Sequence, residues 1–193
     1  MRFLPVLTAV CILSAAATAQ TTIRGKVEDV QGTANQFYLD GTIIPVVSNV
    51  LNLNLWQGQH AFLDVTNIGT AAAPILRIDA ATPTTKMMDM GNLRLGQTKT
   101  WEVFAPTGMA AFIFMDWTPN TRFVPIPQFG GAWLMGGQPF LLAGGVTLGG
   151  VFQTTYTTPN NPIFLGLEVT SQALVGSQNI WEFSNVDSKT VEN

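Results

Sequence analysis

Residues 123–167 read FVPIPQFGGAWLMGGQPFLLAGGVTLGGVFQTTYTTPNNPIFLGL, and this stretch contains no charged side chain. Three structures compete for such a stretch: a membrane-spanning helix, a self-associating surface and the tightly turned strands of a β-domain. Five prolines and four Gly-Gly pairs interrupt it, so no window offers the roughly 20 apolar residues that a membrane helix needs. The stretch therefore predicts short strands in which Gly-Gly supplies turns or bulges. The pairs are Gly130-Gly131, Gly136-Gly137, Gly144-Gly145 and Gly149-Gly150.

Apolar and polar residues alternate in short runs elsewhere, and each run is bounded by Gly, Pro, Asn or Thr clusters. A period of two is typical of half-buried strands, because successive side chains point to opposite faces. No segment after residue 19 keeps apolar residues at helical spacing over three turns. The sequence therefore predicts an all-β protein. The alternating positions are Leu51, Leu53 and Leu55, then Ala61, Leu63 and Val65, then Leu76, Ile78 and Ala80.

The first 19 residues have the pattern of a cleaved secretory signal peptide. Arg2 precedes a short apolar core, and Ala17-Thr18-Ala19 forms an A-x-A cleavage site before Gln20. The sequence therefore predicts a secreted protein, extracellular, on the cell surface or periplasmic, with no transmembrane segment after cleavage. Its single cysteine, Cys11, lies in the signal peptide, so the mature chain is expected to fold without disulfides.

The composition excludes several classes of protein. Charged residues make up 11% of the chain, against about a quarter in typical globular proteins. A nucleic-acid partner needs a basic face, and the 9 basic residues are outnumbered by 12 acidic ones. High apolar content with low net charge also argues against disorder.

The mature chain is expected to divide near residue 85, in a polar, proline-containing segment. Residues 20–85 resemble the oligonucleotide/oligosaccharide-binding (OB) barrel in a glycine-containing first strand, an F-Y-L-D-G hairpin at 37–41 and a G-Q strand at 58–65. The Asp40-Gly41 pair predicts a type I′ turn, which needs positive φ at both central residues. The resemblance implies a small barrel with a ligand-capable face over its second and third strands.

Residues 86–193 resemble a β-sandwich module found in secreted proteins of planctomycete-type bacteria. The shared marks are a G-x-T strand ending in Trp101, a P-x-G turn at 106–108, a P-N-x-P-x-x-x-G segment at 159–166, and later Q-A-L and S-N motifs at 172–174 and 184–185. The resemblance implies a β-sandwich fold and export from the cell, and it implies no known chemical activity. The predicted fold is therefore an OB-like barrel followed by an antiparallel β-sandwich.

No motif predicts an enzyme, a cofactor or a metal site. His60 and Asp64 share a strand face but stand about 13 Å apart, beyond the reach of an acid–base pair. Met87-Met88-Asp89-Met90 offers thioethers that copper favours, or hydrophobes of a strand and turn. Calcium ligation remains an alternative at the turns that hold Asp29, Asp40 and Asp187.

Three tryptophans are candidate ligand-binding residues: Trp56 on the barrel, and Trp117 and Trp133 beside turns. Exposed rings can serve as sugar platforms or protein anchors. The alternative is a ring that folds back onto its own domain.

The favoured function is an exported, non-catalytic structural or interaction protein, such as a cell-surface or envelope component that self-associates. The alternative is a glycan- or small-ligand-binding module that uses these tryptophans, and an enzyme with scattered carboxylates comes third. An uncharged strand edge lacks protection against pairing, so 123–167 is the expected self-association surface. A lysine at Thr147 is expected to leave folding intact and weaken assembly.

Overall fold

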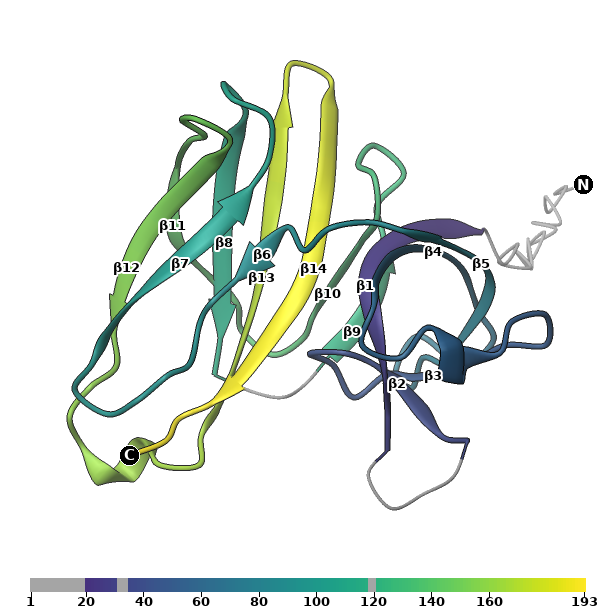
Figure 1. The fold of residues 1–193 in the computed structure, drawn as a ribbon, viewed down its shortest axis with the longest axis horizontal. Coiled ribbons are helices and arrows are strands. Elements are labelled where there is room, and N and C mark those ends of the chain that lie inside the picture. Colours follow the sequence, from purple (N-terminus) through teal and green to yellow (C-terminus); the bar gives the residue numbers. More distant parts are fainter. Residues whose placement is uncertain (1–19, 31–34, 118–120) are drawn as a thin grey trace, which may run out of the picture.

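The computed structural model describes residues 20–30, 35–117 and 121–193. It is all-β, with 57% strand and 4% helix, and combines a closed five-stranded barrel with antiparallel sheets. Figure 1 shows the barrel at one side of the molecule and the sandwich at the other. The predicted fold class is therefore confirmed. The predicted signal peptide lies outside the described residues.

The barrel closes in the order β1-β2-β3-β5-β4, and β4 pairs back onto β1. All its strand pairs are antiparallel except β3 with β5. Alternation decides which face is inside: on β4, Ala61, Leu63 and Val65 are buried, as the sequence predicts. The strands are β1 (Thr21–Asp29), β2 (Phe37–Leu39), β3 (Pro45–Val47), β4 (His60–Asn67) and β5 (Leu76–Pro83).

The Asp40-Gly41 hairpin lies where expected, but its turn type was predicted wrongly. Gly41 has φ +72°, whereas Asp40 is not among the residues with positive φ. A type I′ turn needs positive φ at both positions, so the turn instead has the single positive-φ residue of a type II-like arrangement. After the turn, the Ile44 N–H donates a hydrogen bond to Thr42 Oγ1 at 3.0 Å.

The predicted strand through Leu51, Leu53 and Leu55 is wrong, because Leu53–Leu55 forms the 3-10 helix η1. Asn52 lies before its first turn, and its side-chain oxygen accepts a hydrogen bond from the Asn54 N–H. An asparagine that bonds to the backbone two residues on competes with strand formation. Leu53 alone of the three leucines is buried.

The sandwich consists of two antiparallel sheets over one core. One sheet has the order β11-β8-β13-β14 and the other the order β12-β7-β6, while β9 and β10 form a separate hairpin. Trp101 and Ile113 lie at the centre, both fully buried. The elements are β6 (Met88–Asp89), β7 (Thr98–Phe104), β8 (Ala110–Asp116), β9 (Thr121–Pro125), β10 (Ala132–Met135), β11 (Phe140–Val146), β12 (Val151–Thr157), the 3-10 helix η2 (Pro162–Phe164), β13 (Glu168–Ser177) and β14 (Ile180–Thr190).

The uncharged stretch forms β9 to β12 and η2, so its expected division into short strands is correct. Three of its Gly-Gly pairs contain a positive-φ residue at a turn. The pair Gly144-Gly145 instead lies inside β11. A Cβ at Gly145 would come within 2.4 Å of the Phe152 ring, and one at Gly144 within 2.8 Å of the Phe112 ring. These two glycines make room for aromatic rings rather than for a turn.

Two buried polar side chains connect separate strands of the second half by hydrogen bonds. Gln172 accepts from the Leu134 N–H at 3.0 Å and donates to the carbonyls of Ala132 and Ser184. Asn185 accepts from two backbone N–H groups and donates to two carbonyls. Gln172 belongs to the Q-A-L motif and Asn185 to the S-N motif. In this chain both amides hold elements of the fold together, since burying an amide requires hydrogen-bond partners for all its groups.

The two halves share a core at their junction. Phe123, Ala132, Leu134 and Val186 belong to the same buried cluster as the barrel interior. The chain passes from one half to the other between the end of β5 and the start of β6, which brackets the predicted division near residue 85. The boundary itself remains a prediction.

Candidate functional site

The two sides of the sandwich differ in whether side chains connect the outermost strands of its two sheets. On the side toward the barrel, β6 and β14 are the outer strands, and side chains close the gap between them. Asn185 Oδ1 accepts from the N–H groups of Met87 and Met88 at 2.9 and 3.0 Å. Asp187 Oδ2 accepts from the Met90 N–H at 2.9 Å. We call this side, where side chains of β14 bond to the backbone of 87–90, the closed edge.

Ion pairs reinforce the closed edge. Lys86 lies 3.0 Å from Asp187 and 3.1 Å from Asp89, and Lys189 lies 3.1 Å from Asp187. Burial acts to lower the pKa of Lys86, but the charges and hydrogen bonds of Asp187 and Asp89 together hold that pKa above its usual value. Four charged residues of this half thus meet where β6 and β14 approach each other.

On the opposite side, β11 and β12 are the outer strands, joined by the turn 147–150. Within the described residues, β11 pairs only with β8 and β12 only with β7. Figure 1 shows both strands, in green, on the side of the molecule away from the barrel. Neither strand nor the turn contains a charged residue. We call β11, β12 and this turn the open edge.

Apolar side chains project from the open edge. Leu148 is 75% exposed at the turn, and Leu141 is 55% exposed on β11. A shallow hollow of about 350 Å³ runs between the strands. It is lined by Val146, Leu148, Val151, Phe152 and Gln153.

The two strands of the open edge are not equally suited to pairing. β11 has an irregular register between Leu141 and Ala143, and bulges of this kind protect an edge. β12 runs in unbroken register with β7 from Val151 to Thr157 and reads VFQTTYT. A seven-residue segment of high β-propensity without charge, proline or glycine is the type that adds to another strand. Of the two strands of the open edge, β12 is therefore the one with the regular, uncharged outer side.

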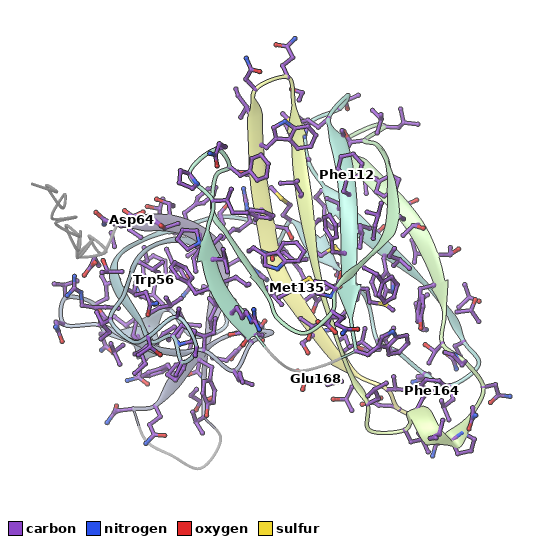
Figure 2. All side chains as sticks on the ribbon, turned by 180° about the vertical axis from the view of Figure 1, so that it is seen from behind. Trp56, Asp64, Phe112, Met135, Phe164 and Glu168 are labelled. Atoms are coloured by element: carbon purple, nitrogen blue, oxygen red, sulfur yellow. The ribbon has the colours of Figure 1, made fainter. Side chains whose placement is uncertain are left out.

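The outer face beside β11 continues the apolar surface. The rings of Phe112 and Trp181 stack with centroids 6.0 Å apart. Figure 2 shows Phe112 above Met135 in the view from behind. Both rings are half-buried.

The three candidate tryptophans lie apart and pack onto their own molecule. Trp133 contacts Phe114 and Phe183 in edge-on geometry, at 5.1 and 5.8 Å between centroids. Trp117 lies 6.1 Å from Tyr156 and 5.9 Å from Phe164. Trp56 packs partly buried against the barrel core, as its position in Figure 2 indicates. The structure does not bring them together into one platform.

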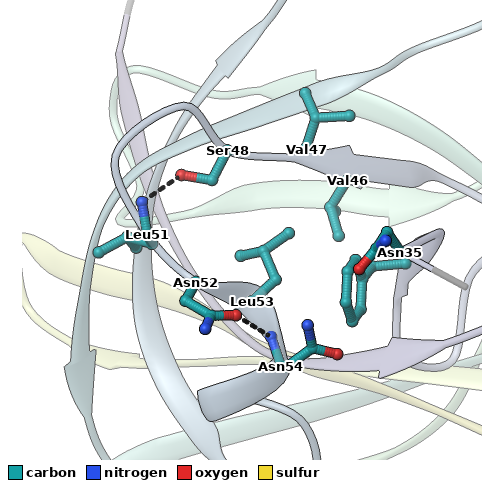
Figure 3. Close-up of a pocket in the computed structure, with 9 residues that line it drawn as sticks. Asn35, Val46, Val47, Ser48, Leu51, Asn52, Leu53 and Asn54 are labelled. Atoms are coloured by element: carbon teal, nitrogen blue, oxygen red, sulfur yellow. Dashed lines mark hydrogen bonds between the residues drawn. The ribbon is translucent and has the colours of Figure 1, made fainter.

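A second candidate surface lies on the barrel, over β2 and β3. Figure 3 shows a hollow there, of about 290 Å³, with an apolar floor and asparagines at its rim. Asn52 is held by its bond to the Asn54 N–H, and Ser48 Oγ accepts from the Leu51 N–H at 2.9 Å. This is the face that the OB resemblance implies. Trp56 does not line it. The lining residues are Asn35, Phe37, Val46, Val47, Ser48, Leu51, Asn52, Leu53 and Asn54.

The candidate metal-binding residues do not gather into a cluster in the described part of the chain. No three His, Cys, Asp or Glu side chains gather there to hold a metal ion. Of the aspartates considered for calcium, Asp40 lies 3.2 Å from Lys26, and Asp187 pairs with two lysines. Asp64 accepts a hydrogen bond from Thr22. The three methionines of 87–90 are buried in the sandwich core.

The expectation for Thr147 is wrong. This residue is fully buried, and its hydroxyl donates to the Pro106 carbonyl at 2.6 Å and accepts from the Met109 N–H at 3.0 Å. A lysine here would lose both bonds and bury a charge, so it would damage folding. The absence of charge in the sequence does not show which single positions are exposed, and that required the structure.

Comparisons with protein-family models, with curated proteins and with solved structures find no match for this chain. No helix in the described residues has the length and apolar character that crossing a membrane requires. The function therefore has to follow from the geometry of the chain itself.

Proposed function

We propose that this chain is an exported, non-catalytic structural or interaction protein of the cell surface or envelope that self-associates through its open edge. The observation that supports this proposal is the contrast between the two sides of the sandwich. Ion pairs and buried side chains close one side, whereas the other ends in uncharged strands whose outer sides have no partner strand in the described residues. An exposed strand without charge is a template for another chain.

A second copy of the same chain is the occupant that fits this edge. β12 of one copy pairs antiparallel with β12 of the other around a two-fold axis, which makes a continuous sheet. Such an interface uses the same patch twice, and neither β12 strand carries a charge itself, although Gln153 donates to Glu102 on the neighbouring strand β7 at 2.6 Å. Leu148 and the hollow beside it then supply the apolar contact next to the paired strands.

The test is the oligomeric state of the mature protein by sedimentation velocity, with matched lysine variants. Thr155 on β12 and Thr100 on β7 are exposed and lie directly opposite each other. Thr155→Lys places a charge on the edge strand of each copy and should shift the protein to monomer. Thr100→Lys adds the same charge on the inner strand and should leave assembly intact.

A second pair of variants tests the apolar contact. Leu148→Lys should weaken assembly, while Leu55→Lys, at a barrel leucine that is 69% exposed, should not. A protein that is monomeric at high concentration, or one in which all four variants assemble equally, would contradict the proposal.

A second candidate function, binding of a glycan or small polar ligand, is favoured by the asparagine-rimmed hollow over β2 and β3. Asparagine amides donate and accept hydrogen bonds, and an apolar floor suits a sugar ring face. Asn52→Ala should abolish ligand binding in a glycan array while leaving self-association unchanged. An array without any hit would remove this candidate.

A further inference from the structure

We propose that the exported chain begins with a modified residue, a pyroglutamate formed from Gln20. The inference rests on the export part of the proposed function, because only cleavage after Ala19 gives Gln20 a free amine. A glutamine at a chain start places its own amine and its own side-chain amide a few bonds apart. Closure gives an unstrained five-membered lactam.

The reaction is balanced and needs no further reactant. The α-nitrogen of Gln20 attacks its own Cδ, so an N–Cδ bond forms and the Cδ–Nε2 bond breaks. Ammonia leaves with the proton that the amine gives up, and no atom changes its oxidation state. The attacking amine must be uncharged, and an α-amine with a pKa of about 7.7–8.0 supplies that form near neutral pH.

Gln20 lies outside the paired strands, so its side chain and its amine are free to form the lactam. It is exposed and lies just before β1, whose first residue, Thr21, is already in register with Val65 of β4. Strand pairing therefore fixes the chain only from Thr21 onward. The atoms that react are all within Gln20, outside the barrel sheet.

The surface next to Gln20 has room for the lactam. Gln20 lines a hollow of about 400 Å³ together with Pro125, Ile126, Pro127 and Phe129. The lactam is uncharged and compact, so it can lie against these apolar side chains. Closure also removes the amine that aminopeptidases require, which suits a protein exposed outside the cell.

Mass spectrometry of the full chain, produced in an exporting host and purified from the exported fraction, tests the proposal. The N-terminal peptide should begin at residue 20, be lighter than the unmodified peptide by one ammonia, and resist an amine-reactive label. A peptide that begins at Gln20, has its full mass and takes the label would overturn the proposal. A peptide that begins at Met1 would overturn the export proposal as well, so the two failures are distinguishable.

Gln20→Asn is the matched control. Its side chain is one carbon shorter, so the corresponding lactam would be a strained four-membered ring. The variant should be cleaved at the same bond, keep a labelled amine and be trimmed by an aminopeptidase, whereas the parent protein resists trimming. Equal trimming of both proteins would contradict the modification.

Discussion

Asn185 has the largest structural role of any single side chain at the closed edge. Its amide satisfies the N–H groups of Met87 and Met88 and the Met88 carbonyl. Asn185→Ala should leave these buried groups without partners, at about 1–3 kcal/mol each, and lower the free energy of unfolding by about 3–5 kcal/mol. Urea denaturation measures this. Asn54→Ala, at an exposed asparagine, should change stability by less than about 0.5 kcal/mol.

His60 gives the chain a stability that depends on pH. Burial, aided by the positive charges of Lys26 and Lys86, lowers the pKa of His60 below 6.5, although Asp40 and Asp187 oppose this. The unfolded chain therefore takes up the proton first as pH falls. The stability from neutral His60 is complete above pH 6.5 and declines as pH drops through the folded pKa.

The corresponding experiment compares urea denaturation at about pH 7.5 and about pH 5. The parent protein should lose stability between these values, and His60→Gln should lose less. Carboxylates with lowered pKa values, such as Asp89, respond only at more acidic pH. An identical loss in both proteins would show that His60 does not contribute.

At the scale of the elements, Gly145 and Phe152 set how closely β11 and β12 approach. Gly145→Ala would drive a methyl group into the Phe152 ring, at 2.4 Å, and overpacking of this kind costs about 1–3 kcal/mol. Thermal unfolding should show that loss of stability. The double variant with Phe152→Leu should recover part of it, and full additivity of the two changes would contradict the contact.

The same elements show what sequence patterns can and cannot predict. Alternation predicted β4 and the first half of β5, where Leu76 and Ile78 face the barrel core and Ala80 does not. It failed at Leu51–Leu55 because a local bond from Asn52 outweighs the pattern. Gln172 and Asn185 bond to residues far away in the chain, and no local pattern identifies such partners. Absence of charge indicated the region of the open edge, but the order of strands in the sheets was needed to place β12 outermost.

At the scale of the whole molecule, the shared core at the junction predicts cooperative unfolding. Leu134 of β10 is packed into the barrel cluster, and its N–H bonds to Gln172 of the sandwich. Calorimetry should show one transition. Leu134→Ala should lower stability by about 2–5 kcal/mol and shift that single transition as a unit. Two transitions, only one of them shifted, would indicate that the halves unfold independently.

Self-association through the open edge concerns the whole molecule, and hydrogen–deuterium exchange at two protein concentrations tests it most directly. Pairing of β12 with a second copy bonds amides that are open to solvent in the monomer. The account predicts that amides of 151–157 become more protected at high concentration, while those of β6 and β14 stay unchanged. Protection of β12 that does not depend on concentration, or a change confined to the barrel, would contradict it.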